Sequence, residues 1–268
     1  MIKRIIFLSD VDGTLLRGAS GIHQKVIKAA HEYIEAGGLL SLSTGRSLVS
    51  SRWAAQKLKV NIPCILYTGS VIYDFDTEQC IWSRCFDSDI IQILEQLYIE
   101  YPEISIQVYT LDNIFMLRSN GRLLSKGIKE EIPDRISQLA DIHGDPLKLL
   151  LSCDDVETLH KCKEHLFSSD KVIFSFSSTH FAEVVAEGAG KDNAMKRLSE
   201  MYDVQLSSFF SAGDGMTDLP MMELSGYSFA PVTAPKTLLD SCDMIIPSCE
   251  EGGMEIAFNY ARNNIKSV

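Results

Sequence analysis

The sequence lacks the cysteine pattern of a disulfide framework or of a zinc site. Its seven cysteines are an odd number, and no two of them are spaced as Cys-x-x-Cys. Scattered cysteines of this kind are typical of a reduced chain in the cytosol. We therefore expect free thiols and a cytoplasmic location.

Long hydrophobic runs are also missing. No apolar run reaches the ~18 residues at which a membrane-spanning helix is expected. The first apolar stretch, residues 5–8, gives way to Asp10 too early to form the core of a signal peptide. We therefore expect no membrane as a partner. The chain shows neither an internal repeat nor a low-complexity linker.

An excess of positive charge is absent as well. The chain has 25 Lys and Arg against 36 Asp and Glu, a formal net charge of −11, and its sequence pI is near 5.0. Nucleic acids and anionic membranes favour the opposite balance, so we expect no nucleic acid as a partner. A small anionic substrate is still compatible, because it needs only a local positive site. The oligomeric state is not encoded in these features.

The composition is that of a folded protein of considerable size. Of the 268 residues, 46% are hydrophobic, which is enough for a real core. The length is large for one compact domain, and it suits two domains or one domain with a large insertion.

Strand-like and helix-like segments alternate in the N-terminal part of the chain. The apolar runs at 4–9, 39–43 and 64–67 predict strands, and the segments at 22–36 and 47–58 predict helices between them. This order is typical of a parallel sheet with crossover helices.

The pattern changes near residue 86 and returns near residue 189. Helices are predicted at 88–100 and 154–167, among strand-like runs at 105–110, 114–118, 146–152, 171–177 and 181–186. A helix at 191–202 and strands at 209–212, 227–230 and 244–246 then resume the first pattern. We therefore predict an α/β fold with a Rossmann-like parallel sheet core, residues 1–85 and 189–268, and an inserted α+β cap domain, residues 86–188.

The first candidate motif, Asp10-Val11-Asp12-Gly13-Thr14, directly follows the first predicted strand. Two carboxylates at the carboxyl end of a parallel strand lie where α/β sheets bind ligands. Hard divalent cations prefer such oxygen ligands, and Gly13 permits a sharp turn. The alternative is an Asp-rich turn that caps a helix, which the preceding apolar strand disfavours.

Three further motifs follow strands or begin helices. Ser43-Thr44-Gly45-Arg46 suits a phosphate cradle, or an ordinary helix cap. Lys191 at a helix start opposes the helix dipole, a cost that a bound anion would explain, although a solvated surface lysine is the common case. The last motif is Gly213-Asp214-Gly215-Met216-Thr217-Asp218, which again has carboxylates at a strand end. They either complete a metal site or belong to a loop that leads into a helix.

Together these motifs are more specific than any one of them. In this order they resemble the four motifs of the haloacid dehalogenase-like superfamily of phosphohydrolases. The insertion between the second and third motifs resembles the type-two cap of its IIB branch, the Cof-like sugar-phosphate phosphatases. The resemblance covers essentially the whole chain. Thr68 and Thr217 depart from it, because they stand where that branch usually has Asn.

The resemblance implies a Mg²⁺-dependent phosphatase that acts on a small phosphorylated metabolite, expected to be a sugar phosphate. Asp10 would form an aspartyl-phosphate, and Asp12 would act as general acid and then as base. Mg²⁺ would be held by Asp10, the Asp12 main-chain carbonyl and Asp214, with Asp218 in support. The implied phosphate-binding residues are Thr44, Gly45, Arg46 and Lys191.

Several alternatives stay open at this point. For Arg46, a structural ion pair is an equally good role. A sugar phosphomutase shares the aspartyl-phosphate, whereas a non-catalytic phosphometabolite-binding protein would not need the intact acidic motifs. We expect surface or packing roles for the histidines and tyrosines of the insertion, among them His143, His160, His165, His180, Tyr98, Tyr101 and Tyr109.

Overall fold

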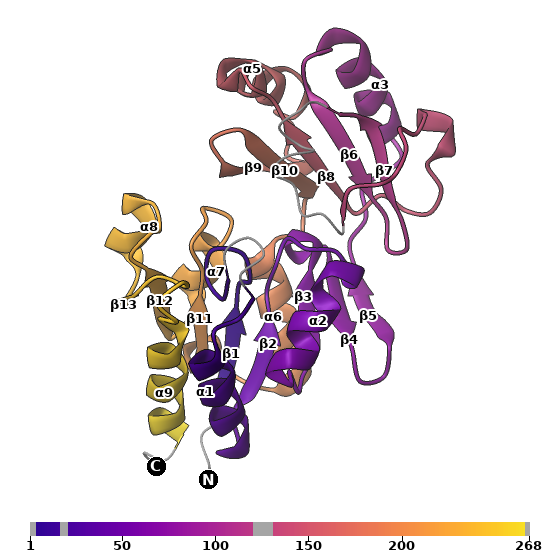
Figure 1. Ribbon diagram of the computed structural model, residues 1–268. Coiled ribbons are helices and arrows are strands. Elements are labelled where there is room, and N and C mark those ends of the chain that lie inside the picture. Colours follow the sequence, from indigo (N-terminus) through magenta and orange to yellow (C-terminus); the bar gives the residue numbers. More distant parts are fainter. Residues whose placement is uncertain (1–3, 17–20, 120–130, 266–268) are drawn as a thin grey trace.

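The computed structural model describes residues 4–16, 21–119 and 131–265. They form two regions, which lie one above the other in Figure 1. The lower region is built on a parallel sheet and the upper region on an antiparallel sheet. No helix in the described part of the chain is long and apolar enough to cross a membrane.

The parallel sheet has the strand order β13-β12-β11-β1-β2. Its central strand, β1 (Ile6–Ser9), is buried along its whole length, as its apolar run predicts. It pairs in parallel with β2 (Leu39–Leu42) and with β11 (Phe209–Ala212). β12 (Tyr227–Pro231) and β13 (Met244–Ile246) extend the sheet to one edge.

Helices cover both faces of the parallel sheet. Side chains of β1 alternate between the faces, so that Phe7 packs in the cluster with α1 and α9, while Leu8 packs in the cluster with α6, α7 and α8. The helices of this region are α1 (Gln24–Glu35), α2 (Leu48–Leu58), α6 (Lys191–Tyr202), α7 (Leu219–Leu224), α8 (Lys236–Ser241) and α9 (Met254–Ile265).

The upper region contains a five-stranded antiparallel sheet of order β7-β6-β8-β10-β9. Two helices pack with it around a separate hydrophobic cluster, which runs from Phe86 to Ala186. The elements are α3 (Ile90–Glu100), β6 (Ser105–Tyr109), β7 (Ile114–Arg118), β8 (Lys148–Ser152), α5 (Val156–Leu166), β9 (Val172–Ser178) and β10 (Phe181–Ala186). We call residues 86–188 the inserted segment.

A small third sheet connects the two regions. It consists of β3 (Cys64–Leu66), β4 (Val71–Asp74) and β5 (Gln79–Ser83), all antiparallel. The sequence predicted β3 as a member of the parallel series. β3 pairs along its length with β4, and a parallel bridge between Ile65 and Ser43 joins it to the end of β2. The β4–β5 hairpin was not predicted.

The predicted architecture is confirmed: a parallel α/β sheet carries an insertion with an antiparallel sheet. The chain leaves for the inserted segment and returns from it at adjacent points, because Arg84 Nε donates to the Glu187 carbonyl at 2.9 Å. The division into domains at residues 85/86 and 188/189 stays a prediction.

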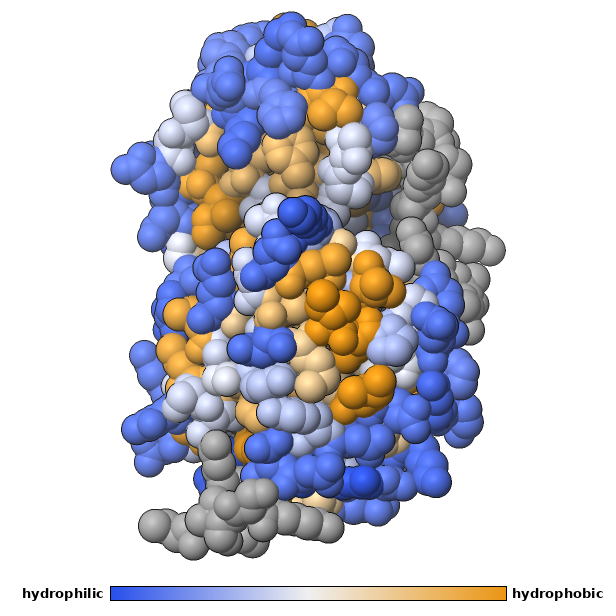
Figure 2. Space-filling view, turned by 90° about the vertical axis from the view of Figure 1, so that its left-hand side faces the viewer, coloured by the Kyte–Doolittle hydropathy of each residue, from blue (hydrophilic) through white to orange (hydrophobic). Residues whose placement is uncertain are grey.

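The face of the molecule on which the edge strand β13 lies is shown in Figure 2. Polar residues cover the top of this face, and hydrophobic residues gather around the middle of the lower region. Val232 and Ile245 are among the exposed hydrophobic residues of β12, β13 and their connections. Single exposed hydrophobic side chains are ordinary on protein surfaces.

Candidate active site

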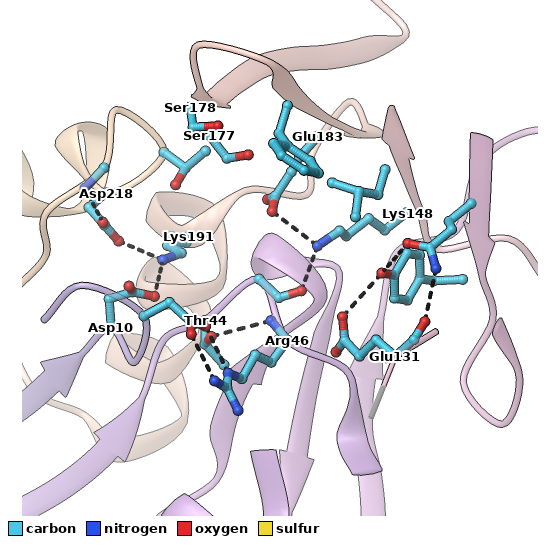
Figure 3. Close-up of a pocket in the computed structure, with 18 of the residues that line it drawn as sticks. Asp10, Thr44, Arg46, Glu131, Lys148, Ser177, Ser178, Glu183, Lys191 and Asp218 are labelled. Atoms are coloured by element: carbon cyan, nitrogen blue, oxygen red, sulfur yellow. Dashed lines mark hydrogen bonds and ion pairs between the residues drawn. The ribbon is translucent and has the colours of Figure 1, made fainter. Parts of the chain in front are cut away.

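Four segments meet at the carboxyl edge of the parallel sheet. Asp10 follows β1, Thr44 follows β2, Asp214 follows β11, and Lys191 is the first residue of α6. Because parallel strands end at the same edge, residues far apart in the sequence come together there. They line one cavity of about 420 Å³, whose side chains are shown in Figure 3.

Gly13 allows the first of these segments to approach the last. Its φ is +85°, and a Cβ at this position would lie 2.0 Å from Asp214 Oδ2. The neighbouring Thr14 hydroxyl donates to Asp214 Oδ1 at 2.9 Å. Any side chain at position 13 would therefore displace Asp214, which explains the need for glycine.

Lys191 is buried inside the site and is not the solvated lysine of the alternative interpretation. Its ammonium lies 2.8 Å from Asp10 Oδ1 and 2.5 Å from Asp218 Oδ1. Burial lowers the pKa of a lysine, but these two carboxylates more than offset burial and raise the pKa of Lys191. Lys191 is therefore a fixed cation beside Asp10.

Asp10, Asp214 and Asp218 form a cluster that fits a divalent cation. One oxygen of each lies within 4.8 Å of the others. Burial, followed by repulsion from Asp218, raises the pKa of Asp214 to about 7. Burial also raises the pKa of Asp10 well above its ordinary value, although Lys191 opposes this shift. One lysine cannot balance three carboxylates, and such hard oxygen donors suit Mg²⁺.

Asp12 lies apart from this cluster and is held by Arg46. Arg46 Nε and Nη2 each donate to one Asp12 carboxylate oxygen at 2.7 Å, a bidentate arrangement that fixes the side chain. Burial lowers the pKa of Arg46, but the bonds to Asp12 outweigh burial and raise it. Arg46 thus makes an ion pair, and its contact with phosphate stays a prediction. The Asp12 main-chain carbonyl as a metal ligand also stays one.

The loop at 44–47, which contains Arg46, forms one wall of the cavity. The Thr44 amide donates to the Ile65 carbonyl at 2.9 Å, and the Thr44 hydroxyl accepts from the Arg46 amide at 3.2 Å. Thr44 is buried, and both Thr44 and Gly45 line the cavity. The loop then turns into α2, whose N-cap residue is Ser47.

The inserted segment supplies the facing wall through an ion pair. Lys148 on β8 lies 3.1 Å from Glu183 on β10, and it also donates to the Gly45 carbonyl at 2.6 Å. The Thr68 hydroxyl donates to the second Glu183 oxygen. Burial raises the pKa of Glu183, but Lys148 and Thr68 more than offset it, so this pKa lies below its ordinary value. Figure 3 shows this pair above the loop.

Glu131 makes a second connection between the inserted segment and the loop. Its Oε1 accepts from the Ser47 amide at 2.6 Å and from the Ser50 hydroxyl at 2.5 Å. Its Oε2 accepts from the Tyr109 hydroxyl at 3.1 Å. Tyr109 is buried, as expected of a packing residue, but it also lines the cavity.

Lys148, Glu183 and Glu131 were not identified from the sequence. A signal was present for the first two, because each is a single charged residue in an otherwise apolar predicted strand. Glu131 lies outside any helix or strand that the sequence predicted. The four histidines of the inserted segment are absent from the described residues that line this cavity.

Comparison with known proteins agrees with this geometry. The sequence model of haloacid dehalogenase-like hydrolases matches residues 7–258. The chain belongs to this family.

Relatives of this haloacid dehalogenase-like hydrolase match it over nearly its whole length. A Bacillus subtilis 5-amino-6-(5-phospho-D-ribitylamino)uracil phosphatase is 25% identical over 272 residues, covering 91% of this chain and 93% of the relative. A haloacid dehalogenase-like hydrolase structure from Bacteroides thetaiotaomicron has a TM-score of 0.83 at 22% identity, covering 96% and 99%. A structure described as a subclass IIB sugar phosphatase has a TM-score of 0.83 at 16% identity, covering 96% and 98%.

These findings confirm the resemblance to the haloacid dehalogenase-like superfamily that the motifs indicated, and the chain shares its fold with a structure described as subclass IIB. The haloacid dehalogenase-like hydrolase is a phosphoric monoester hydrolase. The roles of the individual site residues stay predictions.

Proposed function

We propose that this hydrolase is a magnesium-dependent phosphatase of the sugar-phosphate class that works through an aspartyl-phosphate on Asp10. The observation that carries the proposal is the position of Asp10. It lies at the end of β1, bonded to Lys191 and within the carboxylate cluster, while Asp12 faces the same cavity from a separate position. The names of the ribityl-phosphate and sugar-phosphate relatives support the substrate class.

In the first step, Asp10 attacks phosphorus, and the bond from phosphorus to the leaving oxygen breaks. Asp12 gives its proton to that oxygen, so the leaving group departs as a neutral alcohol. In the second step, Asp12 takes a proton from a water molecule that attacks the aspartyl-phosphate. This step releases inorganic phosphate and restores the Asp10 carboxylate.

The remaining residues bind and orient the phosphoryl group. The Thr44 hydroxyl, the Gly45 amide and the Lys191 ammonium bind its oxygens, at the start of a helix where anions are favoured. A Mg²⁺ ion held by the Asp10 and Asp214 carboxylates and the Asp12 carbonyl, with Asp218 in support, would shield the nucleophile from the charge of the phosphate.

Arg46 gives the two carboxylates of the first motif separate roles. Because it binds the Asp12 carboxylate on both oxygens, Asp12 stays out of the cluster that contains Asp10. To act as the general acid, Asp12 must leave at least one bond to Arg46, because a carboxylate that accepts from a guanidinium on both oxygens carries no proton. The inserted segment covers the cavity, excludes water and contacts the leaving group.

The test is Asp10→Asn. Asn is nearly isosteric with Asp but is a very poor nucleophile, so phosphate release should fall by at least about 10³-fold while the fold is kept. The assay measures inorganic phosphate from aryl and sugar phosphates without any bisphosphate activator. Asp240→Asn, a change in an exposed ion pair with Lys236, serves as the control. Turnover by Asp10→Asn near the wild-type rate would exclude the mechanism, and a requirement for a bisphosphate would favour a phosphomutase.

A further inference from the structure

The part of the cavity wall that belongs to the inserted segment carries an ion pair that the mechanism above does not use. The side chains of Lys148 and Glu183 are only 3% and 12% exposed, yet both line the cavity. Charged groups are rarely buried unless they are paired, and a buried ion pair is often no more stabilising than a hydrophobic pair of similar volume.

The pair presents a hydrogen-bond donor and an acceptor side by side. Lys148 uses two of the three N–H groups of an ammonium for Gly45 and Glu183. Glu183 accepts one bond from Lys148 and one from Thr68, although a carboxylate has about four lone-pair sites. A hydroxyl group both donates and accepts, so adjacent hydroxyls complement such a pair.

The pair also lies next to the phosphate-binding loop. A Cβ on Gly45 would lie 2.8 Å from Glu183 Oε1, so the carboxylate packs directly over that residue. A leaving group whose phosphate is bound by the Gly45 amide would therefore bring its first carbons and their hydroxyls to Lys148 and Glu183. Uncharged polar side chains line the same wall, namely Gln107, Ser177 and Ser178.

Thr68 holds the carboxylate in this position at a conformational cost. Its φ and ψ are 58° and 32°, a left-handed conformation that is unusual for a β-branched residue. Such strain persists only where the surroundings enforce it. The hydroxyl bond to Glu183 is one of the contacts that enforce it here.

The charges of the cavity disfavour a second anionic group on the substrate. Six carboxylates and three cations line it among the described residues. Two of the cations are already paired, Lys148 with Glu183 and Arg46 with Asp12, and Lys191 lies at the phosphate position. A second phosphate or carboxylate would meet repulsion without a free partner.

We propose that Lys148 and Glu183 are specificity-determining residues, which bind the hydroxyl groups of a neutral sugar or polyol leaving group and reject leaving groups that carry a second anion. This assignment rests on the proposed phosphatase function and adds to it the class of leaving group.

The experiment compares substrates that differ in one charged group. The pairs are glucose 6-phosphate with 6-phosphogluconate and fructose 6-phosphate with fructose 1,6-bisphosphate, and p-nitrophenyl phosphate reports chemistry without hydroxyl contacts. In each pair, the wild-type enzyme should show a kcat/KM about 10-fold or more higher for the substrate whose leaving group is uncharged. Lys148→Met should lower kcat/KM for the neutral sugar phosphates by about 10- to 100-fold, the range of a hydrogen bond to a charged group. Aryl phosphate should lose much less, because it lacks the hydroxyl contacts and is affected only through the bond from Lys148 to the Gly45 carbonyl.

Glu183→Gln is the second variant, because it keeps the shape and an acceptor for Thr68 while it removes the charge. This variant should lower the preference for the substrate with the uncharged leaving group by about fivefold or more in each pair. Lys171→Met is the matched control, since Lys171 pairs with Asp89 on the exposed surface of the same segment. Thermal unfolding of each variant verifies that it is folded.

Four outcomes would count against the assignment. An equal loss on aryl and sugar phosphates would mean that the pair only supports the loop. A wild-type preference for the bisphosphate or the gluconate would contradict the charge argument. If Glu183→Gln keeps the substrate selectivity of the wild type while Lys148→Met behaves as expected, Glu183 has no role in specificity. If neither variant changes the selectivity, the pair has none. Absence of phosphate release from every substrate, aryl phosphate included, would overturn the proposed function together with this assignment.

Discussion

Asp10 and Asp12 differ in their partners, although only one residue separates them. Lys191 bonds to Asp10 at 2.8 Å, inside a buried cluster with Asp214 and Asp218. Arg46 bonds to Asp12, whose side chain is 46% exposed. The residue types alone suggest two equivalent carboxylates, whereas their partners place Asp10 in a buried cluster beside a lysine and leave Asp12 half exposed beside a guanidinium.

The role of Asp12 leads to a prediction about leaving groups. Asp12→Ala should slow hydrolysis of a sugar phosphate by ~10²–10⁴-fold, which is the usual contribution of a positioned general acid. An aryl phosphate has a better leaving group, so its first step should lose much less. Single-turnover rates with both substrates measure that step directly. Equal losses for the two substrates would argue against Asp12 as the acid.

The carboxylate cluster predicts how stability depends on pH and on metal. Burial and Asp218 raise the pKa of Asp214 from 3.8 to about 7. A carboxyl group with a raised pKa binds its proton more tightly in the folded state, so its contribution to stability is lost as pH rises from 3.8 through about 7. In EDTA, the unfolding temperature of the wild type should therefore fall over this range.

Excess Mg²⁺ should remove much of that loss, because the ion favours the ionised carboxylates and stabilises the folded state by mass action. In EDTA, Asp214→Asn should show a smaller decrease than the wild type over the same range. Differential scanning calorimetry at about pH 5 and about pH 7.5 provides the measurement. If wild type and Asp214→Asn lose stability equally in EDTA, the carboxyl group with the raised pKa is not Asp214.

The sequence predicted that the motif residues meet at one edge of the sheet, because their signal is local. Asp10, Thr44 and Asp214 each follow a short apolar run, and parallel strands bring such positions to one edge. The partners of these residues could not be predicted in the same way. Arg46 meets Asp12 across 34 residues, and Lys148 meets Glu183 across 35, which depends on the register of β8 and β10. No local pattern encodes such pairings.

At the scale of elements, α2 is the helix that connects the loop at 44–47 to the inserted segment. Its N-terminal amide at Ser47 and the hydroxyl of Ser50 both donate to Glu131. A carboxylate at this end of a helix is favoured by the helix dipole and satisfies an amide that the helix leaves free. The N-terminus of α2 is therefore capped by a side chain from the inserted segment.

Removing this carboxylate should destabilise the protein. Glu131→Ala leaves buried donors at Ser47, Ser50 and Tyr109 without this acceptor, which should lower the free energy of unfolding by about 1–3 kcal/mol. Glu131→Gln keeps one acceptor oxygen and should cost less. Urea unfolding measures both, with Glu157→Ala on the exposed surface of α5 as the control. A cost for Glu131→Ala no larger than that of the control would contradict the capping role.

Elements that were missed had weak or short signals. β5 is mostly exposed and so lacks the apolar pattern of a core strand, and α7 and α8 have only six residues each. α9 is different, since its buried residues recur at helical spacing, among them Met254, Ala257, Phe258 and Ala261. That period is visible in the sequence, so α9 could have been predicted.

At the scale of the whole molecule, the inserted segment joins the lower region at adjacent points, as the Arg84–Glu187 bond shows. Deleting residues 86–188 and closing the gap with a short Gly/Ser linker should therefore leave a core that folds. That core keeps all four motifs but loses Lys148, Glu183 and Glu131. It should retain part of its activity on aryl phosphate and lose its selectivity among sugar phosphates.

Circular dichroism and Mg²⁺-dependent thermal stabilisation establish whether the shortened chain is folded. Its phosphate release is then compared with that of the full chain across the same substrates. A folded core with the selectivity of the full chain would contradict the role of the inserted segment. A core that cannot fold would count against the predicted division into domains.

The attachment of the inserted segment to the loop at 44–47 has a kinetic consequence. Lys148 bonds to the Gly45 carbonyl and Glu131 to the Ser47 amide. In the proposed mechanism the Gly45 amide binds phosphate, so closure of the inserted segment and phosphate binding would share this loop. By reciprocity, whatever free energy closure adds to the binding of phosphate, bound phosphate adds to closure. Inorganic phosphate would thus obstruct its own exit, and opening after hydrolysis would limit turnover and cause product inhibition.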